Sequence, residues 1–138
     1  MFIINTYIAK SAIEGVGVFT AEEIAEGRII SKFEPAFDRL ISKMDYLNAP
    51  PHLKALLDRY AFPQPNNPEF IVYEVDNSRF MNHSETPNTD YSNFAEGRAL
   101  RTIAQGEELT CNYNDFFRDY ELLPSELELE KAKRAAGD

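Results

Sequence analysis

Three short segments of this 138-residue chain carry side chains whose types and spacing could bind a ligand and do chemistry. They are residues 14–19 (EGVGVF), 79–88 (RFMNHSETPN) and 106–113 (GEELTCNY). Glycines lack a Cβ and let a backbone approach a ligand closely. Amide and imidazole groups can hydrogen-bond a heterocycle, and a tyrosine hydroxyl can stabilise a developing charge. Taken singly, each segment has a structural interpretation too: a tight turn, a buried polar pair and a core aromatic residue.

Taken together, the three segments resemble the signature segments of SET-domain protein-lysine methyltransferases, in that family's order. In the family, the second segment reads Arg-Phe-x-Asn-His-Ser-x-x-Pro-Asn and the third reads Gly-Glu-Glu-Leu-Thr-x-x-Tyr. A Gly-x-Gly turn in the first segment opens the family's cofactor site. The resemblance covers most of residues 11–117. It implies a small, stand-alone SET domain without a zinc-binding segment after the catalytic tyrosine, because Cys111 is the single cysteine.

Local patterns predict the elements that must position these segments. Residues 2–10, 28–34 and 70–75 read as strands, and 94–101 as a hairpin that turns at Glu96-Gly97. Residues 50–60 read as a helix that begins at proline, with Leu53, Leu56 and Leu57 expected in the core. The class is therefore α+β and mainly β. The resemblance implies a β-clip fold in which the segment around Tyr113 threads under the loop that carries Asn82 and His83, forming a pseudoknot.

Length predicts one domain, residues 1–117, followed by a tail, residues 118–138. A capping box at 125–128 predicts a carboxyl-terminal helix in the tail, packed on or beside the domain. No apolar run reaches the roughly 20 residues of a membrane span, and the amino terminus lacks a secretory signal. We therefore expect a cytoplasmic protein, or a nuclear one in a eukaryotic host, that is not secreted and has no membrane partner.

The resemblance assigns roles to ten residues. Tyr113 would be the active-site tyrosine, and Tyr91 would line the channel that receives the lysine. S-adenosyl-L-methionine would be the cofactor, and no metal is expected. The residues expected to hold the cofactor are Gly15, Val16, Gly17, Arg79, Phe80, Asn82, His83, Tyr113 and Phe116. Tyr60 and Tyr73 are further channel candidates, while Phe116 and Phe117 stand where the family's lid over the cofactor begins.

The predicted function is methyl transfer from S-adenosyl-L-methionine to the side-chain amine of lysine in a protein. The alternative from another class is a non-catalytic β-clip module that binds a peptide or protein partner. The chain carries a net charge of −9, which disfavours nucleic-acid binding and suits a basic, lysine-bearing substrate. A homodimer stays open as one way of recruiting that substrate. The methylated lysine and the number of methyl groups added are not encoded in these motifs.

Overall fold

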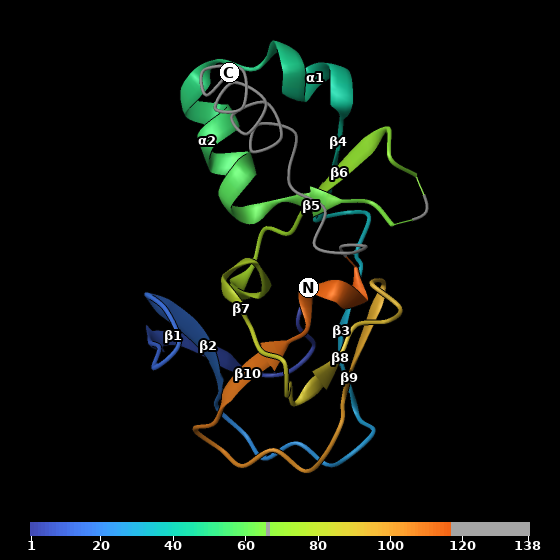
Figure 1. The fold of residues 1–138 in the computed structure, drawn as a ribbon. Helices are drawn as coiled ribbons and strands as arrows, with labels where there is room; N and C mark the ends of the chain where they lie inside the picture. The colour runs from blue at the N-terminus through green and yellow to red at the C-terminus, as the bar shows by residue number, and fades with distance from the viewer. Residues whose placement is uncertain (66, 117–138) are drawn as a thin grey trace, which may run out of the picture.

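The structure, a computed structural model, describes residues 1–65 and 67–116. The predicted tail at 118–138 and Phe117 lie outside the described residues. Within the described part, ten strands form three small sheets, joined by two α-helices and two 3₁₀ turns (Figure 1). The predicted mainly β, α+β class is confirmed. No helix in this part of the chain is long and apolar enough to cross a membrane.

The first sheet carries the first and third signature segments on neighbouring strands. Its strand order is β1-β2-β10-β7. The strands are β1 (Thr6–Lys10), β2 (Val16–Thr20), β10 (Glu108–Cys111) and β7 (Asn82–His83). Strand β10 pairs antiparallel with β2 and parallel with β7, where Thr110 lies opposite Asn82 and Cys111 opposite His83. This pairing brings all three signature segments into one sheet.

The second sheet packs beside the first and closes the main core (Figure 1). Its order is β3-β9-β8, with β3 (Ile29–Lys32), β9 (Glu96–Ala99) and β8 (Thr89–Asp90). Five aliphatic side chains at the centre of the core are fully buried: Val18, Ile24, Ile30, Ile103 and Leu109. Burying such side chains contributes about 1.5–3 kcal/mol each, so this core sets the positions of β2 and β10.

The predicted turn at Glu96-Gly97 is wrong, because both residues lie inside β9. A Cβ on Gly97 would lie 2.5 Å from Cζ of Tyr91 and 2.7 Å from Oγ of Ser31. The glycine is therefore required by the close packing of an aromatic ring on the strand, and not by a turn. A sequence pattern cannot separate these two uses of glycine.

The third sheet and both α-helices form a separate lobe, at the top of Figure 1. Its sheet order is β4-β6-β5, with β4 (Arg39–Ser42), β6 (Phe70–Tyr73) and β5 (Phe62–Pro63). The helices are α1 (Lys43–Asn48) and α2 (Pro51–Tyr60). Helix α2 confirms the predicted helix at 50–60, with Pro51 in its first turn, where the missing N–H costs nothing.

The expectation that three leucines of this helix are core residues is wrong for two of them. Leu57 is 8% exposed and belongs to the lobe's small core, with Tyr46, Ala61 and Ile71. Leu53 and Leu56 are 43% and 39% exposed. This second core is small and contains one leucine of α2, Leu57. Other residues of the helix, among them Asp58 and Arg59, line the cavity described below.

Candidate active site

A cavity of about 640 Å³ lies between the β1–β2 turn, α2, and the turn that precedes β7. That turn is the 3₁₀ segment η1 (Asn77–Phe80), and a second one, η2 (Tyr113–Asp115), follows β10. Six of the ten residues predicted from the sequence line the cavity: Gly15, Val16, Arg79, Phe80, Asn82 and Tyr113. The other lining residues are Glu14, Ala55, Asp58, Arg59, Tyr60 and Met81. The three signature segments therefore meet at one concave site.

The β1–β2 turn forms one wall and is fixed from both sides. Gly15 has a φ of +48°, in the left-handed region that favours glycine. Its carbonyl oxygen accepts a 2.9 Å hydrogen bond from the backbone N–H of Ser11. Across the sheet, Nδ2 of Asn82 donates to the carbonyl oxygens of Glu14 (3.2 Å) and Val16 (3.1 Å). The turn is thus tied to β7 next to the cavity.

Arg79 places a guanidinium among aromatic rings in the cavity wall. Its Cζ lies 4.7 Å from the ring centroid of Phe80 and 5.7 Å from that of Tyr60, and Nη1 donates to the hydroxyl of Tyr73 at 3.0 Å. Its Nε is buried without a hydrogen-bond partner among the described residues. None of the ion pairs found in that part of the chain includes Arg79. Arg79 therefore brings to the cavity wall a positive charge that no ion pair among the described residues neutralises.

Tyr113, at the start of η2, carries the hydroxyl that the sequence predicts to be catalytic. The hydroxyl donates a 2.6 Å hydrogen bond to the carbonyl oxygen of Met81. Burial raises the pKa of the Tyr113 phenol, so the group keeps its proton at neutral pH and acts as a donor. A protonated, fixed hydroxyl in a cavity wall is a preorganised dipole.

His83 does not line the cavity, although the sequence predicts it to bind the cofactor. Its Nδ1 accepts a 3.0 Å hydrogen bond from the backbone N–H of Tyr113, and its Nε2 lies 3.1 Å from Oε1 of Glu85. The centroids of the His83 and Tyr113 rings are 5.1 Å apart. The imidazole therefore contacts the site through Tyr113.

Tyr91 and Phe116 lie behind Tyr113. Tyr91 is 6% exposed, and its hydroxyl accepts a 2.8 Å hydrogen bond from Oγ of Ser31. Burial raises the pKa of the Tyr91 phenol well above its usual range. The ring of Phe116 lies 6.3 Å from that of Tyr91 and 5.8 Å from that of Tyr113. The predicted channel residue is thus linked to the predicted catalytic residue by one intervening ring.

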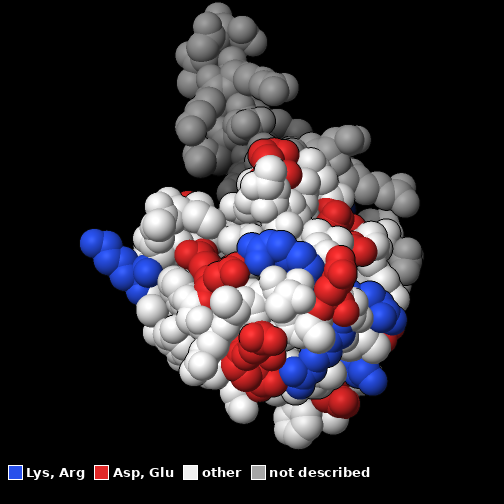
Figure 2. Space-filling model, turned by 90° about the horizontal axis from the view of Figure 1, so that it is seen from below, with Lys and Arg blue, Asp and Glu red and all other residues white. Residues whose placement is uncertain are grey.

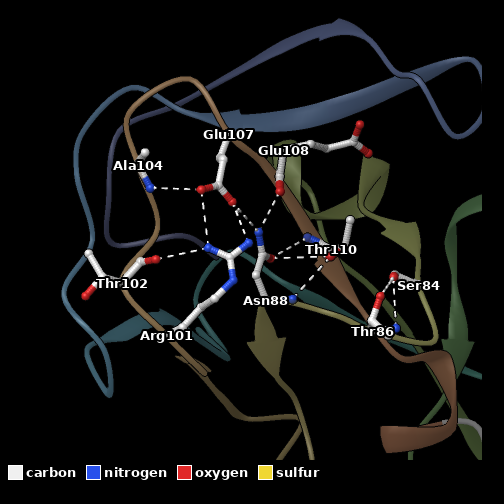
Figure 3. Close-up of polar contacts among 9 residues, drawn as sticks. All are labelled: Ser84, Thr86, Asn88, Arg101, Thr102, Ala104, Glu107, Glu108 and Thr110. Carbon is white, nitrogen blue, oxygen red and sulfur yellow. Dashed lines mark hydrogen bonds and ion pairs between the residues drawn. The ribbon is translucent and has the colours of Figure 1, made fainter.

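The second and third signature segments are joined by the polar network in Figure 3, which centres on Asn88. Nδ2 of Asn88 donates to the carbonyl oxygen of Glu108 (2.8 Å), and its Oδ1 accepts from the backbone N–H of Thr110 (2.9 Å). Glu107 pairs with Arg101 at 2.7 Å, and the neighbouring guanidinium lowers the pKa of that carboxyl. Asn88 is 4% exposed, so these bonds hold β10 firmly against the loop that carries Asn82 and His83.

Two parts of the site have no counterpart in the sequence-based assignment. Helix α2 contributes Ala55, Asp58 and Arg59 to the cavity wall, and only the aromatic character of Tyr60 had indicated this helix. The second part is the carboxylate of Glu108, which approaches β2 so closely that a Cβ on Gly17 would lie 2.6 Å from its Oε2. Among the described residues, no group of three or more metal-binding side chains comes together.

Comparisons with solved structures agree with this arrangement. The chain is similar to a humanized mutant of the Chaetomium thermophilum Polycomb Repressive Complex 2 bound to the inhibitor GSK126. The TM-score is 0.61, with 25% identity over 83% of this chain and 15% of that chain. It is also similar to a Plasmodium falciparum protein provisionally named a histone methyltransferase. There the TM-score is 0.56, with 23% identity over 80% of this chain and 93% of the other.

A third similar structure is the Polycomb complex ctPRC2 in an autoinhibited conformation bound to S-adenosylmethionine. Its TM-score is 0.62, with 24% identity over 94% of this chain and 17% of that chain. At 23% and 24% identity, the Plasmodium protein and this complex show a shared fold alone. The chain spans about a sixth of the length of the two Polycomb chains. A comparison with curated proteins finds no match.

A family model identifies the fold by sequence as well. The model of the SET domain matches residues 15–114, which is more than half of the chain. The matched range contains the Gly-x-Gly turn, the Asn82-His83 segment and Tyr113. In the structure Gly15, Asn82 and Tyr113 line the cavity, and His83 contacts Tyr113. The chain therefore belongs to the SET-domain family.

Proposed function

We propose that this chain binds S-adenosylmethionine in the cavity and methylates the side-chain amine of lysine in a protein substrate. The observation that carries the proposal is the meeting of Gly15, Arg79, Asn82 and Tyr113 around one cavity of about 640 Å³. Membership of the SET-domain family supports it. The similarity to Polycomb Repressive Complex 2 supports it too, although it covers only 15% of that longer chain.

The residues present fit the charged end of this cofactor. Its amino-acid end carries a carboxylate and an ammonium group. Arg79 lines the cavity and forms no ion pair among the described residues, and a guanidinium pairs well with a carboxylate. The Asn82 side chain lines the same cavity and carries an amide oxygen, an acceptor that suits an ammonium group. Arg79 would hold the carboxylate, and the turn at Gly15 and Asn82 would hold the ammonium.

The remainder of the lining fits a nucleoside. Phe80 and Tyr60 meet edge to face, with 5.2 Å between ring centroids, and both line the cavity. Aromatic faces of this kind stack on heterocycles. Asp58, from α2, adds a carboxylate to the same wall, where it can accept from ribose hydroxyls. The cavity wall thus offers both charged and aromatic groups to the cofactor.

When bound, S-adenosylmethionine supplies a methyl group on a positively charged sulfur, which a neutral amine can accept. Tyr113 keeps its proton because burial raises the pKa of its phenol, and its hydroxyl donates a hydrogen bond to the carbonyl oxygen of Met81. We propose that the negative end of this fixed O–H dipole faces the lysine amine. Such a preorganised dipole stabilises positive charge where it develops.

Lysine must lose its proton before it can attack, because its ordinary pKa is about 10.4. Burial against apolar walls disfavours the ammonium form and lowers that pKa. The rings of Tyr91, Phe116 and Phe62 form a continuous aromatic group behind Tyr113. We propose that this group excludes water from the end of the lysine channel, and that Tyr91 contributes to its wall.

We also propose the pseudoknot that the family resemblance implies. Strand β10 lies between β2 and β7, and it pairs in parallel with β7 although the two are separated by β8 and β9 in the sequence. The network around Asn88 binds the intervening loop to β10 (Figure 3). Both contacts support a carboxyl segment that passes beneath the loop carrying Asn82 and His83.

The substrate is proposed to be a basic protein. The chain carries a net charge of −9, and a negative field raises the association rate of a positively charged partner. Figure 2 shows acidic and basic side chains interspersed over the face seen from below in Figure 1, without a single-sign patch on that face. We therefore attribute the preference to net charge. Direct nucleic-acid binding is not proposed, because phosphate contacts require clustered basic residues.

The decisive experiment is transfer of label from methyl-labelled S-adenosylmethionine to a panel of lysine-rich proteins, with Tyr113→Phe as the matched control. We expect label in lysine with the wild-type chain and almost none with the variant. Cofactor affinity is measured in parallel by calorimetry. Label on a group other than lysine would redirect the substrate assignment. Cofactor binding without transfer would mean that the panel lacks the substrate or a required partner. Absence of both would contradict the proposed function and favour the non-catalytic module.

A further inference from the structure

The amide of Asn82 has an orientation that its surroundings dictate. Its Nδ2 lies within hydrogen-bond distance of three oxygens: the carbonyl oxygens of Glu14 (3.2 Å) and Val16 (3.1 Å), and Oε2 of Glu108 (3.1 Å). Carbonyl and carboxylate oxygens are acceptors, so only the NH₂ end of the amide can face them. The carbonyl oxygen Oδ1 must therefore point the other way, and no hydrogen bond among the described residues uses it.

The carboxylate of Glu108 is held in place from its other side. Its Oε1 accepts a 2.7 Å hydrogen bond from Oγ of Ser11, a residue that is 8% exposed. The Ser11 hydroxyl in turn accepts from the backbone N–H of Ile13 at 2.9 Å, so its proton is directed to Glu108. A chain of hydrogen bonds thus runs from the β1–β2 turn through Glu108 to Asn82.

Gly17 leaves the space that this carboxylate occupies. A Cβ at Gly17 would lie 2.6 Å from Oε2 and 2.8 Å from Cδ of Glu108, far inside van der Waals contact. Gly17 itself does not line the cavity. The sequence suggested that this glycine lets a ligand approach the backbone, but in the structure the group that approaches it is Glu108.

We propose that Glu108 is a positioning residue that, together with Ser11, fixes the Asn82 amide so that Oδ1 faces the cavity. The ligand group that this acceptor would receive is a cationic hydrogen-bond donor, the α-ammonium of the cofactor's amino-acid end. The inference rests on the proposed function. Hydrogen bonds between a carboxylate and an amide N–H are stronger than neutral ones, so removing the carboxylate loosens the amide that receives the ligand.

The test uses two probes that differ at the amino-acid end. S-adenosylhomocysteine carries the α-ammonium, and 5′-methylthioadenosine lacks the whole amino-acid group. For Glu108→Ala we expect the dissociation constant of the first probe to rise about tenfold, the scale of one hydrogen bond to a charged group, and that of the second to stay unchanged. Glu108→Gln, which keeps one acceptor oxygen, should show a smaller rise. Equal weakening of both probes would indicate a merely structural role and overturn the proposal.

Two further variants separate positioning from folding. Glu107→Gln removes the neighbouring carboxylate, which pairs with Arg101 away from the cavity, and should leave both affinities unchanged. Asn82→Ala combined with Glu108→Ala should bind S-adenosylhomocysteine no more weakly than Asn82→Ala alone, because Glu108 acts through Asn82. Additive losses would overturn the proposal. A wild-type chain that binds neither probe would instead overturn the proposed function, and this inference with it.

Discussion

The hydroxyl of Tyr113 donates a 2.6 Å hydrogen bond to the carbonyl oxygen of Met81, 32 residues earlier in the chain. The backbone N–H of Tyr113 donates to Nδ1 of His83 at 3.0 Å. Both ends of the tyrosine are therefore fixed by the segment that also supplies Asn82 to the cavity. The position of the hydroxyl is set by the protein itself, so the group is preorganised before any ligand enters.

Tyr113→Phe should abolish most turnover while it leaves cofactor binding largely intact. Loss of one preorganised dipole at a reacting centre costs about 100-fold or more in turnover number. The aromatic ring remains, and so does its packing against His83 and Phe116. Label transfer measures the turnover and calorimetry the affinity. Activity equal to that of the wild-type chain would contradict the catalytic role of Tyr113.

His83→Ala should weaken cofactor binding through Tyr113, since the imidazole does not line the cavity. The variant removes the acceptor of the Tyr113 N–H, and the freed backbone can shift the start of η2. His83→Asn offers an amide oxygen near the position of Nδ1 and should restore part of the affinity. Calorimetry on both variants checks this, and an unchanged dissociation constant for His83→Ala would refute it.

Tyr91→Phe should lower the free energy of unfolding by about 1–2 kcal/mol, because it leaves the buried Ser31 hydroxyl without its acceptor. Urea unfolding measures this loss. We expect turnover to fall less than in Tyr113→Phe, since Tyr91 does not line the cavity. A loss of turnover equal to that of Tyr113→Phe, with stability unchanged, would give Tyr91 a direct part in the reaction.

The stability of the fold should respond to pH with opposite signs at two glutamates. Burial raises the pKa of the Glu74 carboxyl above its ordinary value of 4.5. The folded state therefore binds this proton more tightly than the unfolded state does. The resulting stability is fully present below pH 4.5 and is lost as the pH rises above it. Relative to the wild-type chain, Glu74→Gln should gain free energy of unfolding between pH 4 and pH 7.

At Glu107, Arg101 lowers the pKa of the carboxyl below the same ordinary value. The stability that this ion pair provides is present above pH 4.5 and is lost as the pH falls through the lowered pKa. Glu107→Gln should therefore be less stable than the wild-type chain at pH 7, with a difference that narrows in acid. Urea unfolding at several pH values measures both variants. If the free energy of unfolding varied with pH in the same way for the wild-type chain and Glu74→Gln, the predicted contribution of Glu74 to the pH dependence would be contradicted.

The sequence alone predicted which segments matter and which kinds of element carry them. Hydrophobic periodicity and the position of proline in the sequence predicted the helix at 50–60 and the strands near β1, β3 and β6. Residues Arg79, Asn82 and Tyr113 were assigned to one site through a family resemblance, and the structure brings them to one cavity. The roles of all ten predicted residues in binding or catalysis stay predictions, and the variants above test those of Asn82, His83, Tyr91 and Tyr113.

Only the tertiary structure decided what each of these residues touches. The contact between Ser11 and Glu108 joins residues 97 positions apart, and it exists because β10 pairs with β2. Gly97 looked like a turn but lies in a strand beneath Tyr91, and the two exposed leucines of α2 looked like core. Local patterns report the conformation and the average burial of a segment. Which partner fills the space beside a glycine, or covers one face of a helix, is set by strand pairing and packing across the whole chain.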